Sequence, residues 1–381
     1  MKRFLVLMMC ACGMFAQQRA ARPPQFRSPE VSPDGRITVR FLAPLANEVK
    51  LRGEWMAAGE NVPLEKDGNG IWSVTVGPVK PEYYYYSLIA DGVTVIDPKN
   101  PALKQGVAGP SSMVDVPGPE TEFFASKTVP HGAVHVHWYD SKALGRSRRL
   151  HVYTPPGYET NTKSKYPVLY LLHGSGDTDR EWVEVGKANF ILDNLIAAGK
   201  AKPMIIVMPD GHAVDPNSAD PSARRQNTAR FEEDLLGDVM PLAESTYRVA
   251  SGAGNRALAG LSMGGGQTLA IGLTHPGRFG FLGVFSAGVG FGPSPEAASR
   301  QFEERYAAVL GAPEKLNKQV ALFWIGIGEA DNGLASAKLL DQALTRHNVK
   351  HEFHEAGGAH QWRVWRHFLA DFAPRLFRKP S

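Results

Sequence analysis

One short stretch constrains the fold of this chain more than any other: a strand-like run, a Gly-x-Ser-x-Gly pentapeptide and a helix-like run follow one another directly. The apolar run Arg256–Ala259 leads into Gly260, Ser262 and Gly264, and a helical pattern continues over Gln267–Leu273. Such a junction must turn sharply, and glycines have no Cβ to collide with the strand and helix packed around it. The serine would be held in strained geometry, its hydroxyl over helix N–H groups that favour negative charge.

The pentapeptide alone fits two interpretations. It is the signature of the nucleophile elbow of α/β-hydrolases, in which Ser262 would be the attacking group. It also fits a glycine-rich turn with a helix-capping serine, which is common in α/β proteins. The rest of the chain favours the elbow.

From Tyr166 onward, buried apolar runs alternate with helical patterns. The predicted strands are Pro167–Leu172, Met204–Met208, Ala257–Leu261, Phe279–Phe285, Val320–Ile327 and His351–Glu355. The predicted helices are Ala188–Ala198, Arg230–Tyr247, Met263–Thr274, Glu296–Leu310, Ala335–His347 and Arg363–Leu376. Two further strands, Ala133–Trp138 and Arg148–Thr154, are expected as an antiparallel entry. This alternation predicts an α/β fold with a mostly parallel sheet covered on both faces.

The chain before this region has a period of two. Short alternating runs are separated by turn signals such as Pro33-Asp34-Gly35 and Asp91-Gly92. The runs are Ile37–Phe41, Val49–Leu51, Trp72–Val76, Tyr83–Ile89 and Val93–Ile96. Strands at this spacing predict a small, all-β, immunoglobulin-like sandwich.

The N-terminus has the pattern of a secretory signal. Lys2 and Arg3 precede the apolar run Phe4–Phe15, which is too short to span a bilayer comfortably. We expect cleavage near Ala16 and a secreted or periplasmic product; a buried N-terminal helix is the alternative. The predicted division is a signal peptide over 1–16, a linker over 17–30, the sandwich over 31–117, a linker over 118–130 and the hydrolase domain over 131–381.

Composition excludes several classes of function. Both cysteines, Cys10 and Cys12, lie in the signal segment and neither follows a convincing lipobox, so lipid anchoring is less favoured and no thiol chemistry is expected. The formal net charge of +4 is small and no basic block stands out, so nucleic acid is not a favoured partner. No spacing of metal ligands and no further membrane span is evident, and we expect neither metal nor cofactor.

A serine nucleophile needs a base and an acid that orients the base. In α/β-hydrolases these follow the serine in the order acid, histidine, each after a strand. The strand Leu322–Gly328 ends in Glu329 and Asp331, and the last predicted strand leads to His360. We therefore predict Ser262, Asp331 and His360 as catalytic residues, with Glu329 as the competing acid. His351, His354 and His367 are expected to be structural or to pack on the surface.

An acyl-transfer site also needs donors for the oxyanion. Strand Pro167–Leu172 runs into His173-Gly174-Ser175, and a His-Gly pair at this point commonly supplies one backbone N–H. The residue after the nucleophile supplies the other. We assign the two donors to the backbone N–H groups of Ser175 and Met263, and give the His173 side chain a structural role.

Together these motifs resemble carbohydrate esterase family 1, the esterase-D-like group, over about His131–Phe377. The matching segments are Leu172–Gly174, Trp182, Asn189–Leu195, Met208–Gly211, Asp234–Leu236, Arg256–Gly265 and Gly358–Trp362. Many relatives have Gly-Gly-His where this chain has Gly358-Ala359-His360. The resemblance implies ester hydrolysis but does not fix the acyl group.

The region from Val31 to Pro117 is similar to the early-set sandwich related to carbohydrate-binding module family 48. The similarity rests on Phe41–Pro44, Gly70–Val74, Pro81–Tyr86 and Asp91–Pro101. Some members of that family bind α-glucan and others only pack beside a catalytic domain. Because alternate residues of a strand face opposite sides, the four tyrosines Tyr83–Tyr86 are expected in core or interdomain packing rather than on one sugar-binding platform.

Three functions are compatible with these features. The first is a secreted serine esterase that removes feruloyl or acetyl groups from plant xylan or its oligosaccharides; the sandwich and hydrolase occur joined in feruloyl and acetylxylan esterases of this family. The second is a siderophore esterase of the enterobactin type, which acts inside the cell and so fits the signal segment poorly. The third is a glycan-binding protein with an inactive hydrolase fold, which an intact triad argues against. The oligomeric state is left open.

Overall fold

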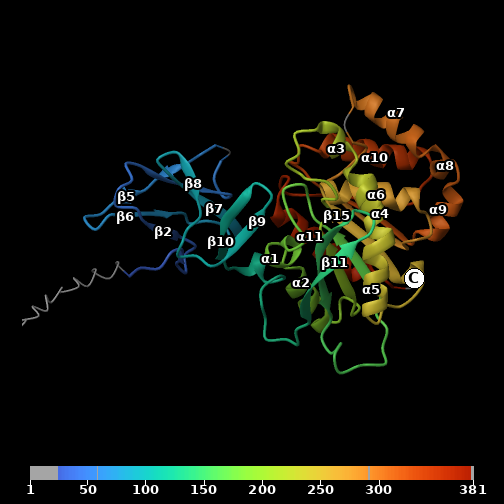
Figure 1. The fold of residues 1–381 in the computed structure, drawn as a ribbon, viewed down its shortest axis with the longest axis horizontal. Coiled ribbons are helices and arrows are strands. Elements are labelled where there is room, and N and C mark those ends of the chain that lie inside the picture. Colours follow the sequence, from blue (N-terminus) through green and yellow to red (C-terminus); the bar gives the residue numbers. More distant parts are fainter. Residues whose placement is uncertain (1–24, 58, 291, 379–381) are drawn as a thin grey trace, which may run out of the picture.

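The computed structural model describes residues 25–57, 59–290 and 292–378. It has two parts, an all-β part with the N-terminal residues and a larger α/β part (Figure 1). The predicted signal peptide and the first part of the predicted linker lie outside the described residues. Over the described ranges, no helix is long and apolar enough to cross a membrane.

The all-β part consists of two antiparallel sheets. One has the order β1 (Glu30–Val31), β2 (Ile37–Leu42), β6 (Ile71–Val76), β5 (Glu65–Lys66). The other has the order β4 (Val62–Pro63), β3 (Val49–Gly53), β7 (Glu82–Ala90), β10 (Gly109–Val116), β9 (Leu103–Gly106), with β8 (Val93–Val95) on β7. Alternate residues of both sheets form one core, including Ile37, Leu51 and Leu88. This packing is the expected sandwich.

The four tyrosines of β7 divide between two cores. Tyr84 and Tyr86 lie in the sandwich core, whereas Tyr83 and Tyr85 pack against the apolar cluster of the larger part. The division follows the period of two of an extended strand. Core and interdomain packing, as predicted, therefore accounts for all four rings.

The larger part is built on an eight-stranded sheet with the order β11-β12-β14-β13-β15-β16-β17-β18. The strands are β11 (Ala133–Ser141), β12 (Arg146–Thr154), β13 (Val168–Leu172), β14 (Ile205–Pro209), β15 (Arg256–Leu261), β16 (Phe281–Phe285), β17 (Leu322–Gly328) and β18 (Glu352–Ala356). β12 is antiparallel to both neighbours and the later strands are parallel to one another. The predicted α/β-hydrolase fold is confirmed.

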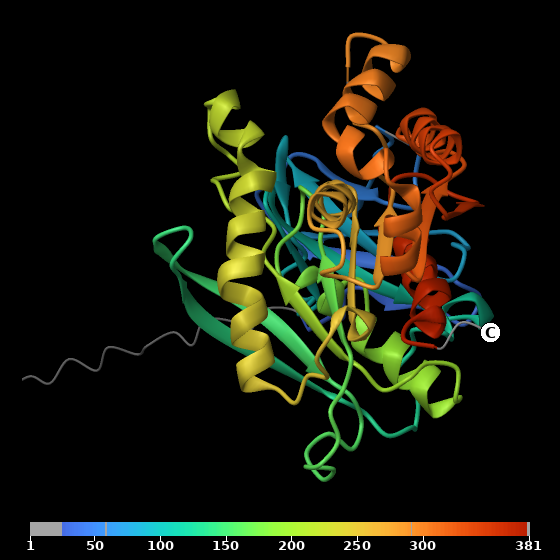
Figure 2. The same cartoon turned by 90° about the vertical axis from the view of Figure 1, so that its right-hand side faces the viewer.

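Helices cover both faces of this sheet. One face packs against α4 (Asn227–Asp234), η2 (Leu235–Val239), α5 (Met240–Thr246), α6 (Met263–Thr274), α7 (Pro295–Arg305), α8 (Ala307–Leu310), α9 (Pro313–Gln319) and α10 (Leu334–Arg346). The other packs against α1 (Glu181–Glu184), α2 (Ala188–Ala197) and α11 (Trp362–Phe372). In Figure 2, α4, η2 and α5 form one long yellow helix, matching the single helix predicted there. α3 (Pro221–Arg225) and the one-turn η1 (Pro119–Thr121), η3 (Ala253–Asn255) and η4 (Ala373–Arg375) complete the elements.

The two parts share a buried interface. Arg366 of α11 is 0% exposed and its guanidinium donates to the Glu82 carboxylate at 2.7 Å and to the carbonyls of Tyr83 and Val185. The predicted linker 118–130 also packs here, because Phe124 is buried in the same cluster. The all-β part is thus attached through a core, not through a free tether.

Candidate active site

The turn after β15 has the geometry expected of a nucleophile elbow. Ser262 has φ 53° and ψ −114°, a conformation that non-glycine residues rarely adopt. Its N–H donates to the Phe285 carbonyl at 2.8 Å, which ties the turn to β16. A Cβ on Gly260 would lie 2.6 Å from the carbonyl carbon of Gly264, and one on Gly264 would lie 2.6 Å from the His173 oxygen. Only glycine fits at either position.

The structure brings Ser262, His360 and Asp331 together from three loops that follow parallel strands. His360 Nε2 lies 2.9 Å from Ser262 Oγ, and His360 Nδ1 lies 2.9 Å from Asp331 Oδ2. When Nδ1 carries the ring proton and donates a hydrogen bond to the Asp331 carboxylate, Nε2 presents a lone pair to the Ser262 hydroxyl. This is the arrangement in which histidine accepts the serine proton.

Asp331 rather than Glu329 is the acid in contact with the histidine. The Asp331 side chain is fully buried and its Oδ1 accepts from the Gly333 N–H at 2.8 Å, whereas Glu329 is exposed. Burial raises the pKa of the Asp331 carboxyl, but hydrogen bonds from His360, Gly333 and Ser286 outweigh it and hold the pKa below its usual value. The carboxylate therefore stays ionised beside the imidazole.

Ser286 and Trp365 support this pair, and no sequence motif pointed to either residue. Ser286 follows β16 with φ 51° and accepts from the Trp365 indole N–H at 2.9 Å. The Trp365 ring meets the His360 ring edge to face, with centroids 5.0 Å apart. The buried indole thus fixes the plane of the His360 imidazole and the position of the Ser286 hydroxyl, which hydrogen-bonds to Asp331.

The loop after β13 approaches the nucleophile from the other side. A Cβ built on Gly174 would lie 3.5 Å from the Ser262 Cβ, so the residue that precedes Ser175 borders the serine. Met263 follows the serine as the first residue of α6. The Gly174 carbonyl accepts from His173 Nδ1 at 2.8 Å. Because a trans peptide points its C=O and N–H in opposite directions, this bond turns the Ser175 N–H away from His173.

The His173 ring bridges two loops beneath the site. Its Nε2 lies 2.8 Å from the Gly211 nitrogen and 3.2 Å from Asp210 Oδ1. Burial lowers the pKa of this imidazole, but the hydrogen bond and charge of Asp210 outweigh burial and raise the pKa above its usual value. The ring is 1% exposed, so it is a structural loop histidine, as the sequence suggested.

The remaining candidate histidines lie outside this group. His351 contacts Asp341, His354 stacks on Trp324 with centroids 4.9 Å apart, and His367 lies 4.5 Å from the Phe123 ring. These contacts agree with the packing roles predicted for them.

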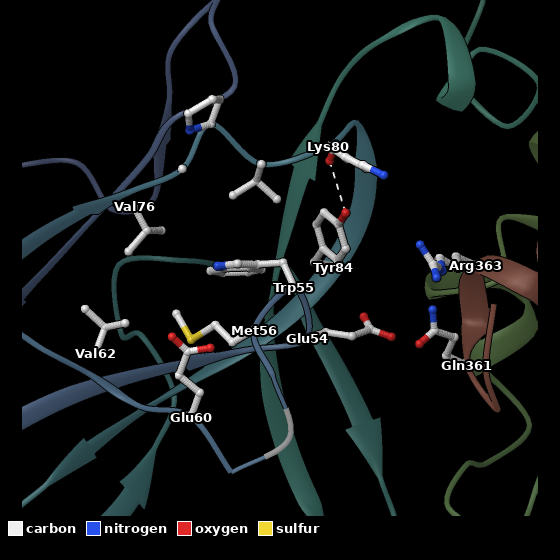
Figure 3. A pocket seen from close by; sticks show the side chains of 13 residues that line it. Glu54, Trp55, Met56, Glu60, Val62, Val76, Lys80, Tyr84, Gln361 and Arg363 are labelled. Carbon is white, nitrogen blue, oxygen red and sulfur yellow. Dashed lines mark hydrogen bonds between the residues drawn. The ribbon is translucent and has the colours of Figure 1, made fainter. Parts of the chain in front are cut away.

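An interdomain pocket of about 500 Å³ adjoins the histidine loop (Figure 3). Trp55 and Tyr84 line it from the sandwich, and Gln361 and Arg363, just after His360, line the opposite side. Glu54 also faces it, and burial raises the pKa of this carboxyl to about 7. The pocket is built by both parts of the chain.

Comparison with known proteins agrees with this geometry. Residues 141–376, more than half of the chain, match the family described as "Putative esterase". The chain belongs to this esterase family. Among curated relatives, an endo-1,4-beta-xylanase/feruloyl esterase of Xylanibacter ruminicola is 33% identical over 355 residues, which are 92% of this chain and 46% of the relative. This chain therefore spans less than half of that relative's length.

Solved structures share the fold. A ferulic acid esterase of Anaeromyces mucronatus, solved with ferulic acid, is 27% identical, with a TM-score of 0.57 over 67% of this chain and 95% of that one. The enterobactin esterase of Shigella flexneri has a TM-score of 0.62 over 90% of this chain and 92% of that one, at 17% identity. At 17% identity the second likeness shows a shared fold and nothing of function, and that fold includes both parts of the chain.

Proposed function

We propose that this esterase removes feruloyl or acetyl groups from xylan or its oligosaccharides through an acyl-enzyme on Ser262, and that it belongs to carbohydrate esterase family 1. The observation that carries the chemistry is the chain of hydrogen bonds from Ser262 through His360 to the buried Asp331. The substrate class is supported by the relative from Xylanibacter ruminicola, whose similarity extends over 92% of this chain.

In the first half-reaction, Ser262 Oγ attacks the ester carbonyl carbon while His360 Nε2 takes the hydroxyl proton. The carbonyl oxygen becomes an oxyanion, which the N–H groups of Ser175 and Met263 stabilise. The C–O bond to the sugar then breaks, and His360 returns the proton to the departing sugar hydroxyl. Asp331 stays ionised and stabilises the imidazolium between these two transfers.

In the second half-reaction, a water molecule attacks the acyl-serine ester. His360 takes the proton of that water and returns it to Ser262 Oγ when the acyl group leaves as a carboxylic acid. The same residues thus act twice, and the reaction consumes one water for each ester.

Two other functions are less well supported. The siderophore alternative rests on the enterobactin esterase fold at 17% identity, which carries no information about substrate. A glycan-binding protein with an inactive hydrolase fold would have no need of the Ser262–His360 contact at 2.9 Å. For the sandwich we propose kinship with carbohydrate-binding module family 48 and a structural role, and for the whole protein export from the cytoplasm.

One assay tests the substrate class. Ferulate and acetate released from arabinoxylan oligosaccharides and acetylated xylo-oligosaccharides are measured with the same purified protein, with Ser262→Ala as the blank. Release of either acid by wild type alone supports the proposal and identifies the acyl group. Turnover of a simple aryl acetate without release of either acid would overturn the xylan assignment while leaving the esterase chemistry intact.

A further inference from the structure

The sandwich touches the loop that borders the nucleophile. Lys104 of β9 places its Nζ 2.5 Å from the Asp177 Oδ1, across 73 positions of sequence. Three residues further on, the Val107 N–H donates to the Gly176 carbonyl at 3.0 Å. Figure 1 shows β9 at the side of the sandwich that faces α1 of the larger α/β part. One hairpin of the all-β part thus holds two consecutive residues of the loop after β13.

This contact is close and largely shielded from water. The Lys104 and Asp177 side chains are 16% and 5% exposed, and Lys104 also lies over the Tyr85 ring. A Cβ on Gly106 would stand 2.9 Å from the Gly176 oxygen, so the hairpin backbone packs directly on the loop. An ion pair removed from water interacts more strongly than a surface pair, and loss of one partner leaves the other charge buried.

The held loop is the one that carries Ser175. The Asp177 N–H donates to the Gly174 carbonyl at 3.1 Å, so Asp177 closes a turn around Ser175. A Cβ position on Gly174 lies 3.3 Å from Asp177 Oδ2 and 3.5 Å from the Ser262 Cβ. The Asp177 carboxylate is therefore fixed by Lys104 on one side and contacts the backbone beside the nucleophile on the other.

We infer that Lys104 is a positioning residue for ester hydrolysis, which sets the Ser175 N–H at the oxyanion through Asp177. The inference rests on the proposed function, since it requires the oxyanion donor at Ser175. It gives the all-β part a role in turnover that needs no glycan: the catalytic loop of one part is held in place by a lysine of the other.

The test compares Lys104→Met with wild type on an aryl acetate, which has no sugar to bind. Removing one oxyanion donor typically costs about 10²- to 10³-fold in kcat; we expect misplacement to cost part of that, about 10- to 100-fold, with KM changed by less than about 3-fold. The inhibition constant of an aryl boronic acid, which forms a tetrahedral adduct on serine, should rise by a similar factor. Lys104→Arg should restore most of both values.

Two further variants keep the test decisive. Lys127→Met removes an exposed ion pair with Glu122 elsewhere in the chain and should leave kcat unchanged. Asp177→Asn keeps the acceptor's shape and should act like Lys104→Met, and the double variant should be no slower than either single one because the two residues act as a unit. Asp177→Asn alone decides the matter if Lys104→Met fails to fold.

The outcomes separate the two claims. Folded Lys104→Met or Asp177→Asn protein with kcat and boronate affinity within about 2-fold of wild type would overturn the positioning role, as would equal losses in Lys104→Met and Lys127→Met. Wild-type protein that neither hydrolyses the aryl ester nor binds the boronate would overturn the proposed function itself.

Discussion

Replacement of Asp331 by asparagine should nearly abolish turnover while leaving the shape of the site intact. The Gly333 N–H donates to Asp331 Oδ1, so the amide oxygen of an asparagine must take that position and its NH₂ must face His360. The imidazole would then accept at Nδ1 and carry its proton on Nε2. A protonated Nε2 cannot take the proton of Ser262.

The magnitude follows from this change of tautomer. In a serine protease, the same substitution in a triad lowers kcat by about 10⁴-fold, which corresponds to about 5 kcal/mol of transition-state stabilisation. We expect Asp331→Asn to lose about 10³- to 10⁴-fold in kcat/KM on an aryl acetate, with an unchanged thermal midpoint. Steady-state rates and melting curves of the same preparations measure both quantities.

Glu329→Gln is the matched control, because its carboxyl is on the same loop but exposed. It should stay within about 3-fold of wild type. A larger loss in Glu329→Gln than in Asp331→Asn would show that the wrong carboxylate has been assigned, whatever the geometry of the loop.

Three other predictions concern the two-part architecture. Arg366→Met leaves Glu82 buried without its partner and should lower the free energy of unfolding by about 3–5 kcal/mol in denaturant titrations. Arg36→Met removes an exposed ion pair and should cost less than about 1 kcal/mol. Similar costs for the two variants would contradict the buried interface. Burial raises the Glu54 pKa from 4.5 to about 7, so the protonated carboxyl's contribution to stability is present at low pH and lost as pH rises through 7. The stability of wild type relative to Glu54→Gln should therefore fall between pH 5 and 8. A constant difference over this range would refute the prediction. Residues 128–381 expressed alone should be poorly soluble or markedly less stable than the full chain. The isolated sandwich, residues 31–117, should not be retarded by starch or xylan in affinity electrophoresis. A fully stable and active truncation, together with a sandwich that binds polysaccharide, would identify a true binding module.

Much of the catalytic geometry could be predicted because parallel strands end at one edge of a sheet. Once Arg256–Leu261 and the later apolar runs are assigned as strands, the residues after them must meet, whatever their separation along the chain. The period of two in β7 likewise predicts that its tyrosines divide between opposite faces, which the structure confirms.

The contacts between the two parts could not be predicted in this way. Lys104 and Arg366 are charged residues within ordinary strand and helix patterns, where exposure is the usual expectation. Arg366 is fully buried at the interface, where it contacts Glu82 of the sandwich and Val185 of the larger part. Single-turn helices such as α1 also escaped prediction, since four residues are too few to show a helical period.

The central claim is that Ser262 carries the acyl group, and intact-mass spectrometry tests it most directly. Protein mixed with a slowly turned-over feruloyl or aryl ester and quenched in acid should gain the mass of one acyl group. Peptide mapping should place that group on Ser262, and Ser262→Ala, whose small residue preserves the elbow, should gain nothing and hydrolyse no ester. Rapid turnover by Ser262→Ala, or an acyl group mapped to another residue, would contradict the account.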